Sequence, residues 1–533
     1  MAESRLENTK RNIIFGLAGK IVQLLFKFLL RTAVIYIFGV AYLGLDALFL
    51  NVLSVLCIAE LGISNAVCYA LYKPFAQSEE TKLRAYITLY RRIYRILGWV
   101  VLFLGLCFLP CLKYIIHLDR AIDMDYRLAY VIFLLNAVIS YWFGAYTQVL
   151  FIADQKTWIV DNIKNLFYVI TVVMEVLAII IFKNYYIYLI IMVAGSLSAN
   201  LAVYTFAKRR YQILLKGKET LSEAEFHELK RNITAMALMK LSSVIYTSSD
   251  NILISSLVGT VMVGYYSNYA YVVSAVTGII SLIFNGAVAS IGNVNIAEKA
   301  EKKKLFFKRM LFLNYAVYGF CYVCMFVLFS DLIRVWVGEA YVFLQDVTQL
   351  ICLLFLISGL NHTCAVYNDA CGLFWKIRYR ALGTAGVNIF LSFILGKQYG
   401  LPGILAATIF SYFLTTFIVD PKVIYRTVFK QSSGEFYRWY ALSLGKSWVI
   451  GLAVKRMLCF IIVRTWWSLI IKIFLCAAVT AGLFFMTSYR SQESRYFREL
   501  IKNEIRNDKN KEIWRMKVRG RKSADKNDKR SSV

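Results

Sequence analysis

Apolar residues in this chain are gathered in long runs of roughly 20, and no other feature restricts the fold as strongly. Of its 533 residues, 59% are hydrophobic and 17% are charged, whereas soluble domains are about 45–50% apolar and about 25% charged. Such runs cross a bilayer as helices, because a helix satisfies its own backbone hydrogen bonds. Transmembrane barrels would show short alternating segments instead. The sequence therefore predicts an all-α polytopic membrane protein.

Fourteen candidate spans can be distinguished. The first follows a polar N-terminus, is too long for a signal-peptide core and has no small-residue cleavage site after it, so we expect it to be retained. All four prolines lie near span ends, so no span is expected to break at a proline. The spans are expected at about 13–38, 43–72, 93–116, 128–152, 158–182, 187–206, 233–257, 261–290, 310–330, 347–369, 381–396, 402–424, 440–463 and 468–488.

Basic residues indicate the orientation of these spans. Most of the 61 Lys and Arg residues fall in segments on the same side as the N-terminus, and the opposite loops are short and poor in them. By the positive-inside rule, both termini are predicted to be cytoplasmic. The net charge of +29 is spread over many short loops and a basic tail, so nucleic-acid binding is not expected.

The chain also repeats itself at an offset of 220 residues. The matching positions include Gly39 with Gly259, Gly44 with Gly264, Lys20 with Lys240, and Asn65 with Asn285. An even number of spans separates the copies, which predicts a parallel repeat about an axis along the membrane normal. The predicted parts are a six-helix lobe (1–230), a second six-helix lobe (231–430), two additional helices (431–490) and a basic cytoplasmic tail (491–533).

Three cations interrupt the first span: Lys20, Lys27 and Arg31. At about 100° per residue, their spacing of seven and four residues places them on one helical face, over about 16 Å. A cation facing lipid tails in mid-membrane costs several kcal/mol, so such residues usually face a watery cavity or a partner. An aligned cationic stripe suits an anion such as a diphosphate. The alternative is snorkelling of Lys20 and Arg31 to the two surfaces, which Lys27 cannot do cheaply.

Polar residues in the other spans are further candidates for a site. Asp250 and Asn251 belong to a polar cluster in the seventh span, where a carboxylate can carry a proton or hold a sodium ion, or serve only as a structural partner. By the repeat offset, Asn251 corresponds to Arg31, so Asp250 is expected near the stripe. Glu175 shares a face of the fifth span with Asp161, Asn165 and Tyr168, which suggests a cavity.

Two more charged residues complete the list of candidates. Glu60 lies toward the inner end of the second span. It is interpreted either as a salt-bridge partner or as part of a gate. Lys240 is the repeat mate of Lys20. The 11 cysteines lie mostly in apolar segments, the three histidines are scattered, and we expect no metal site. No phosphate loop is present, so we expect neither an ATP-driven protein nor any cofactor beyond a coupling H⁺ or Na⁺.

Several segments, taken in their order, resemble one known family. They are Arg31 … Phe38-Gly39 … Gly44-Leu45; Glu60-Leu61-Gly62-Ile63 … Ala66; Ser249-Asp250-Asn251-Ile252-Leu253-Ile254; Val263-Gly264-Tyr265-Tyr266-Ser267-Asn268-Tyr269; and Val335-Trp336-Val337-Gly338. Over residues 10–490 the chain resembles the polysaccharide-transporter branch of the multidrug/oligosaccharidyl-lipid/polysaccharide exporter superfamily, the Wzx-like flippases.

This resemblance implies two six-helix lobes around a central cavity, with two extra helices. It further implies a flippase, not an enzyme, in a bacterial cytoplasmic (inner) membrane. Such a protein would move polyprenyl-diphosphate-linked oligosaccharide to the outer leaflet by ion-coupled alternating access. The glycan would serve a capsule, O-antigen or exopolysaccharide. A polysaccharide polymerase and glycosyltransferases are candidate partners, and anionic lipids are expected at the basic tail, whose residues 495–505 predict a short amphipathic helix on the inner membrane surface.

Three other functions are compatible with the sequence. A drug or cation exporter of the same fold would favour carboxylates over aligned cations in its first helix, and some such relatives bend that helix at a proline that this chain lacks. A membrane glycosyltransferase or polymerase would usually need a sizeable outer loop, and the outer loops here are short. A scaffold protein would need neither the repeat nor the buried charges.

Overall fold

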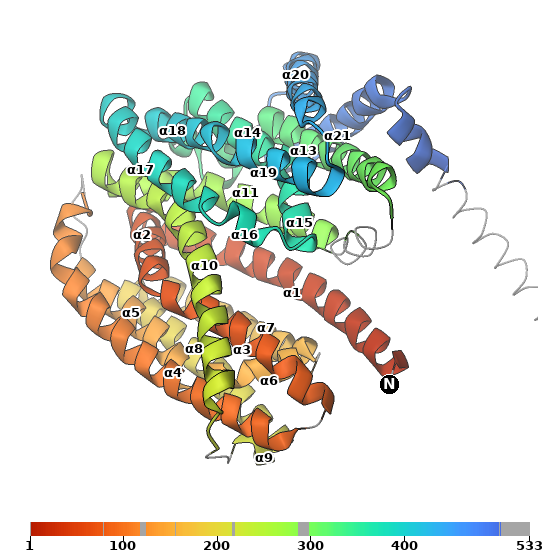
Figure 1. Cartoon of the computed structure of the whole chain (residues 1–533). Coiled ribbons are helices and arrows are strands. Elements are labelled where there is room, and N and C mark those ends of the chain that lie inside the picture. The colour runs from red at the N-terminus through yellow and green to blue at the C-terminus, as the bar shows by residue number, and fades with distance from the viewer. Residues whose placement is uncertain are drawn as a thin grey trace, which may run out of the picture.

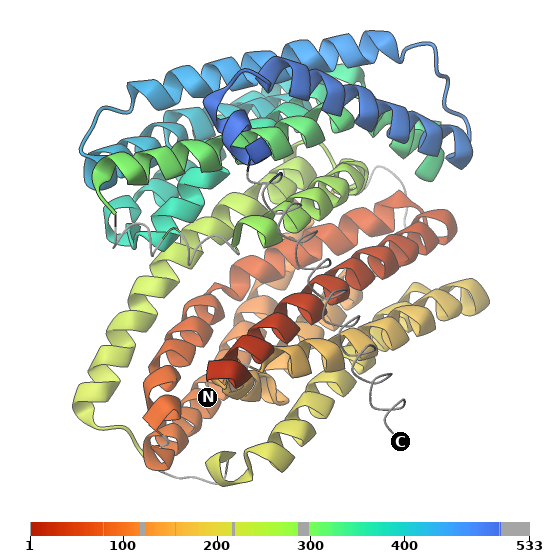
Figure 2. The ribbon, with the colours of Figure 1, turned by 90° about the vertical axis from the view of Figure 1, so that its right-hand side faces the viewer.

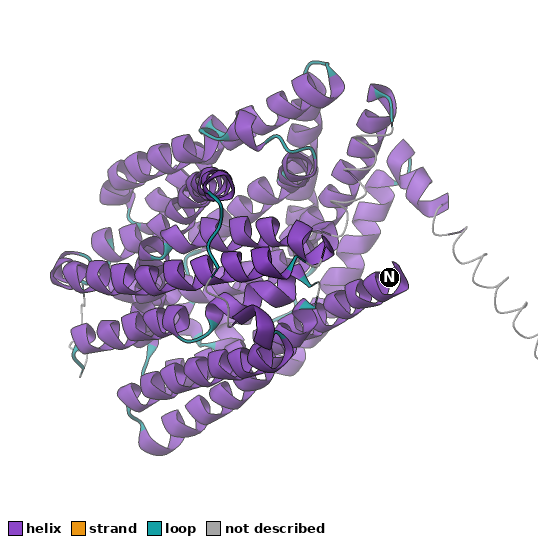
Figure 3. Cartoon of the chain, turned by 60° about the horizontal axis from the view of Figure 1, so that its bottom comes forward, coloured by secondary structure: helices purple, strands orange, loops and turns teal. Residues whose placement is uncertain are grey.

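The computed structural model of the chain describes residues 2–77, 79–117, 124–154, 156–215, 219–285, 291, 298–499 and 502. Within these ranges all regular elements are helical and no strand occurs (Figure 3). The first half contains α1 (Ala2–Ile37), α2 (Val40–Leu56), α3 (Ile58–Gln77), α4 (Glu80–Phe108), η1 (Leu109–Tyr114), α5 (Tyr126–Trp142), η2 (Ala145–Thr147), α6 (Gln148–Ala153), α7 (Thr157–Phe182), α8 (Tyr185–Arg210) and α9 (Gln212–Leu215).

The second half has the same general make-up, followed by two further long helices. Its elements are α10 (Glu223–Leu257), α11 (Thr260–Asn285), α13 (Ala300–Trp336), η3 (Glu339–Tyr341), α14 (Gln345–Leu360), α15 (His362–Ala370), α16 (Phe374–Ile377), α17 (Arg380–Tyr399), α18 (Leu401–Leu414), α19 (Thr416–Ile424), η4 (Tyr425–Phe429), α20 (Gly434–Met457) and α21 (Trp466–Ser488).

Each of the fourteen predicted spans falls mainly on one helix or on two helices in succession. Four of them are broken, at Cys57, Phe143–Thr147, Asn361 and Thr415, and none of these breaks is at a proline. Among the described residues, seven helical stretches are long and apolar enough to cross a membrane by length and composition, and Val40–Leu56 and Tyr126–Trp142 are apolar but shorter. The prediction of an all-α polytopic fold is confirmed.

The packing of the helices repeats between the two halves. In the first half α1 packs on α7, α7 on α8, and α4 on α5. In the second half α10 packs on α17, α17 on α18, and α13 on α14, which are the corresponding helices in chain order. Figures 1 and 2 show the two groups, with α10 extending from one to the other. The two lobes and their parallel repeat are therefore confirmed, while the residue limits given for each part stay a prediction.

The repeat axis passes through a close crossing of α2 and α11. A Cβ placed on Gly44 would lie 2.3 Å from the carbonyl oxygen of Thr260, and one on Gly264 would lie 2.2 Å from that of Val40. Thr260 is the repeat mate of Val40, so the contact is reciprocal, as a two-fold axis requires. Gly39 and Gly259, which precede these helices, both have positive φ (95° and 130°), a conformation that favours glycine.

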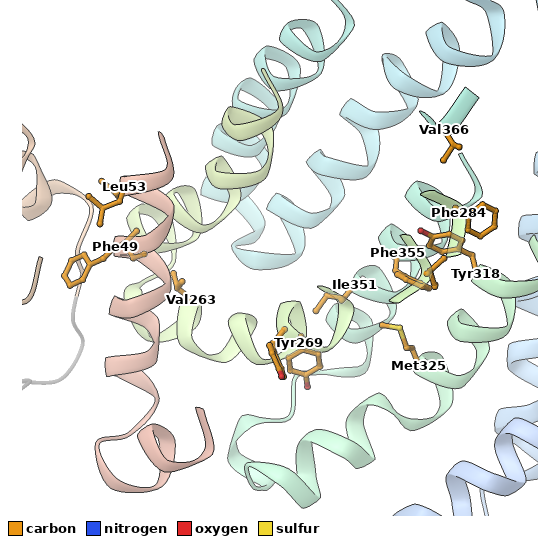
Figure 4. Packing of buried hydrophobic residues seen from close by; sticks show 14 of the residues in the cluster. Phe49, Leu53, Val263, Tyr269, Phe284, Tyr318, Met325, Ile351, Phe355 and Val366 are labelled. Carbon is orange, nitrogen blue, oxygen red and sulfur yellow. The ribbon is translucent and has the colours of Figure 1, made fainter. Parts of the chain in front are cut away.

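An apolar core continues from this crossing into the second lobe (Figure 4). Phe49 and Leu53 of α2 lie on one side of α11, and Tyr318 and Met325 of α13 pack with Ile351 of α14 on the other. The additional helices α20 and α21 pack on α13, where Lys472 of α21 forms a 2.8 Å ion pair with Asp331. A charge buried in the fourteenth span thus joins the extra helices to the second lobe.

The helical turns at residues 492–499 also pack on α13. Phe497 stacks on Phe312 at 6.0 Å between ring centroids, and the guanidinium of Arg309 lies 3.4 Å from the ring centroid of Tyr496. This packing attaches the start of the helix predicted at residues 495–505 to the second lobe. Most of the remaining tail lies outside the described residues, so its binding to anionic lipids stays a prediction.

Candidate functional site

The three cations of α1 lie along α11 in a regular antiparallel register. A Cβ on Gly278 would be 3.5 Å from Cε of Lys20. Seven residues further along α1, the Lys27 ammonium is 5.8 Å from the ring centroid of Tyr271, which lies seven residues before Gly278. Four residues beyond Lys27, Arg31 reaches Ser267, which lies four residues before Tyr271. Since α1 belongs to the first lobe and α11 to the second, the cationic stripe (Lys20, Lys27 and Arg31) faces the junction of the lobes.

Arg31 makes the most contacts of the three. Its Nη2 donates to Ser267 Oγ at 2.7 Å and to Asn268 Oδ1 at 3.0 Å, and its guanidinium lies 5.3 Å from the Tyr271 ring centroid. Two buried donors beside these contacts, Arg31 Nε and Asn268 Nδ2, have no hydrogen-bond partner among the described residues. A buried donor without an acceptor is costly, so this end of the stripe suits an acceptor-rich ligand.

Lys20 and Lys27 are both exposed, although they lie in the apolar first span. In the described part of the chain, none of the three cations of the stripe forms an ion pair. Other membrane-embedded cations do have carboxylate partners, such as Lys472 with Asp331 and Arg380 with Asp420. The stripe is therefore a positive face without a direct ion pair in the described part of the chain.

Helix α7 fixes the orientation of α1. The Gln23 side chain donates to Asn165 Oδ1 at 2.8 Å, and Asn165 occupies the space that a Cβ on Gly19 would need. Tyr168 donates to the carbonyl oxygen of Gln23 at 3.5 Å. The polar face predicted for the fifth span thus packs against α1, and it leaves the stripe free to face α11.

A buried carboxylate close to Arg31 was not among the sequence candidates. Asp46 of α2 is 7% exposed, receives hydrogen bonds from Tyr185 and Tyr188, and interacts electrostatically with Arg31 without forming a direct ion pair. Glu175 is 2% exposed and interacts with Asp46 and Tyr188. Asp46 could have been singled out because an ionisable residue inside a span is itself a functional signal.

The Ile37 end of α1 is fastened to the second lobe by Trp336, which ends α13. Phe28 stacks on Trp336 at 4.5 Å between ring centroids. The Trp336 indole donates to Thr32 Oγ1 at 2.9 Å, and the Tyr36 hydroxyl donates to the Trp336 carbonyl oxygen at 3.0 Å. Together with the glycine crossing, these contacts close the lobes against each other at the end of α1 that is outer in the predicted orientation.

Asp250 lies in a different place, inside the second lobe. Thr408 of α18 donates to both carboxylate oxygens, each at 3.3 Å, and Asn388 of α17 also hydrogen-bonds Asp250. Ser392 Oγ on α17 and Asn251 Oδ1 are buried without partners among the described residues. The partners found for Asp250 belong to α17 and α18 and not to α1, so the structure does not bring it together with the stripe as the repeat offset suggested.

Glu60 is held within the first lobe by two phenols. Tyr94 donates to Glu60 Oε1 at 3.0 Å, and Tyr141 donates to Oε2 at 2.7 Å. The side chain of Lys240 lies outside the described residues. Over the described ranges, no group of three or more His, Cys, Asp or Glu residues is placed to hold a metal ion.

Two repeated six-helix lobes, joined across a cationic face and closed at one end, define the fold of a membrane transporter. The chain belongs to the family described as "Polysaccharide biosynthesis protein", which matches residues 9–289. No curated protein matches it in sequence.

Solved structures share the fold over most of the chain. One is the lipid II flippase MurJ in an inward closed conformation, with 15% identity, a TM-score of 0.62, and coverage of 90% of this chain and 99% of that chain. An inward-facing multidrug resistance MATE family transporter of the MOP superfamily has 11% identity, a TM-score of 0.57, and coverage of 82% and 98%. At these identities the likeness shows the fold and not the substrate.

Proposed function

We propose that this protein flips a polyprenyl-diphosphate-linked oligosaccharide across the bacterial cytoplasmic membrane for the assembly of a surface polysaccharide. The observation that carries the proposal is the stripe of Lys20, Lys27 and Arg31, which faces α11 without a carboxylate ion pair in the described residues. A diphosphate is compact and doubly charged, and it presents several acceptor oxygens, so it matches a row of donors. The family and the flippase fold of MurJ agree with this class of substrate.

The same residues suggest how substrate binding opens the outer end. Without substrate, Arg31 bridges the lobes through Ser267 and Asn268. Diphosphate oxygens bind a guanidinium more strongly than neutral side-chain oxygens do. A diphosphate that reaches Arg31 therefore competes with this bridge and weakens the junction. The diphosphate then binds the outward-open state more tightly than the closed state, and this difference in affinity shifts the protein toward the outward-open state.

Coupling to an ion gradient is assigned to Asp250. Its carboxylate is surrounded by neutral oxygen-bearing side chains from α17 and α18, and it forms no ion pair within the described part of the chain. Oxygen ligands around one buried carboxylate suit a proton or a hard monovalent cation. Occupancy at this point would change how α10 packs on α17 and α18, and α10 also packs on α2 and α3 of the first lobe.

Reconstituted transport tests this function. Protein in liposomes should move a fluorescent polyprenyl-diphosphate sugar between leaflets in a gradient-dependent way, and should not move ethidium, a cationic drug. Ethidium transport without lipid flipping would favour the cation-exporter alternative, for which the buried Asp46 and Glu175 would be the first candidates. Cysteine labelling of intact cells would test the proposed cytoplasmic location of both termini and of Lys303 in the first turn of α13.

A further inference from the structure

A small cationic cavity lies on the first lobe, away from the stripe. It has a volume of about 180 Å³ and is lined by α4, the α5–η2 turn and α8. Arg91 and Arg95, one turn apart on α4, supply its charge. Its walls are aromatic and include Trp142, Tyr146 and Tyr204.

The polar groups of this cavity converge and are hydrogen-bond donors. The Tyr146 hydroxyl hydrogen-bonds Arg91 and interacts electrostatically with Arg95 and Tyr204. No carboxylate lines the cavity, and neither arginine forms an ion pair in the described part of the chain. By contrast Arg84, two turns earlier on α4, pairs with both Glu80 and Glu219 at 3.2 Å. Glu60 contacts the cavity residue Tyr141, and its two carboxylate oxygens accept hydrogen bonds from Tyr94 and Tyr141.

The surroundings place the cavity at the level of lipid headgroups. Trp99, one turn beyond Arg95, is 64% exposed and packs on Trp142 at 4.8 Å between ring centroids. Phe143 on the cavity wall is 42% exposed. Lys208, Arg209 and Arg210 end α8 one turn after Tyr204. Tryptophans beside basic side chains at the ends of apolar helices are typical of the membrane–water interface.

We propose that the Arg91/Arg95 cavity binds the phosphate of an anionic membrane lipid, with the acyl chains along Trp99 and Phe143. Two guanidiniums and a phenol without a carboxylate match the charge and the acceptor oxygens of a phosphate. The exposed aromatic side chains beside them favour a ligand with a hydrocarbon part over a free anion. The cytoplasmic leaflet follows from the orientation proposed above, whereas the site itself does not depend on the transported substrate.

Native mass spectrometry of the delipidated full chain with added phosphatidylglycerol would test this site. The wild type should bind one phosphatidylglycerol more tightly than the rest, and the Arg91→Gln/Arg95→Gln variant should bind it about tenfold more weakly. Arg92→Gln/Arg209→Gln is the matched control, since it removes the same charge from exposed positions that do not line the cavity. Thermal unfolding in detergent would establish that both variants are folded.

Three results would overturn the proposal: equal loss in both double variants, no loss in either, or displacement of phosphatidylglycerol by millimolar inorganic phosphate. The first would mean a diffuse electrostatic attraction, the second a different site, and the third a site for a free anion. Competition by polyprenyl diphosphate for the same single site would support the proposal and would add the carrier lipid as an occupant.

Discussion

Gly44 and Gly264, which are 220 residues apart, lie against each other where α2 crosses α11. Each has a backbone carbonyl of the other helix within 2.3 Å of the position of its absent Cβ. Neither carbonyl can move away as a flexible side chain would, because both belong to helices. This contact fixes how closely the two lobes approach, and it lies at the same end of the molecule as the Phe28–Trp336 stack.

Gly264→Ala is expected to destabilise the closed junction. The added methyl group would overlap the Val40 carbonyl, and overpacking of this kind costs about 1–3 kcal/mol. The melting temperature in detergent should fall, and cysteine crosslinking between the Ile37 end of α1 and the Trp336 end of α13 should decrease. Gly445→Ala on α20 is the control, since a Cβ there meets nothing within 4 Å. Equal melting temperatures for both variants would contradict the assigned crossing.

Arg31→Lys should weaken substrate binding even though the charge is kept. Arg31 uses Nη2 alone to reach Ser267 and Asn268, and its Nε has no partner among the described residues. A lysine ammonium carries its donors on one nitrogen, so it cannot hold a phosphate through two parallel donors as the planar guanidinium can. Loss of one charge-assisted hydrogen bond, worth about 1.5–3 kcal/mol, predicts roughly tenfold or greater loss of apparent affinity for polyprenyl diphosphate. Arg209→Lys on the surface is the control. Wild-type affinity in Arg31→Lys would argue against a bidentate contact.

Asp250→Asn should separate flipping from its driving gradient. The amide keeps the size of the side chain and a hydrogen-bond acceptor for Thr408, but it can neither bind a cation strongly nor carry a proton. Flipping driven by an imposed Na⁺ or pH gradient should fall, with correct insertion confirmed by protease protection. Asp125→Asn, at the exposed N-cap of α5, is the control. Unchanged gradient-driven flipping would make Asp250 a structural residue.

The contact of Glu435 with Lys304 and Lys308, at the start of α20, is expected to depend on pH. Hydrogen bonds from Lys304 and Lys308 hold the pKa of Glu435 below its ordinary value of 4.5. A depressed pKa in the folded state means that this contact stabilises the protein above pH 4.5 and is lost as the pH falls through the lower folded-state pKa. Glu435→Gln should therefore lower the melting temperature at pH 7, and the difference from wild type should shrink on acidification. A difference that stays constant or grows would refute the linkage.

Much of the fold could be predicted because the apolar runs, the charge bias of the loops and the repeated glycines can each be recognised in the sequence itself. The cationic stripe was visible for the same reason, since Lys27 interrupts an apolar run. The partners of the stripe were not visible. Tyr271 and Ser267 lie more than 200 residues away, and only the packing of the lobes decides that they face α1.

The hydrogen-bond partners of Asp250 could not be predicted from the sequence for a different reason. The repeat correctly relates α10 to α1, but α10 presents Asp250 to α17 and α18, whose polar residues Asn388 and Thr408 have no spacing signal that connects them to it. The break at Cys57 between α2 and α3 was also missed, since no proline or glycine marks it.

The flipping rate of the Lys20→Ala/Lys27→Ala/Arg31→Ala variant tests the central claim most directly. The substrate is a fluorescent polyprenyl-diphosphate sugar in proteoliposomes, and the protein content is matched to wild type. A second triple variant, Lys208→Ala/Arg209→Ala/Arg210→Ala, removes the same charge from the end of α8, away from α11. If the stripe binds the diphosphate, the stripe variant loses flipping while the α8 variant retains it, and Lys27→Ala is the most harmful single change. A normal flipping rate in the stripe variant would contradict the account.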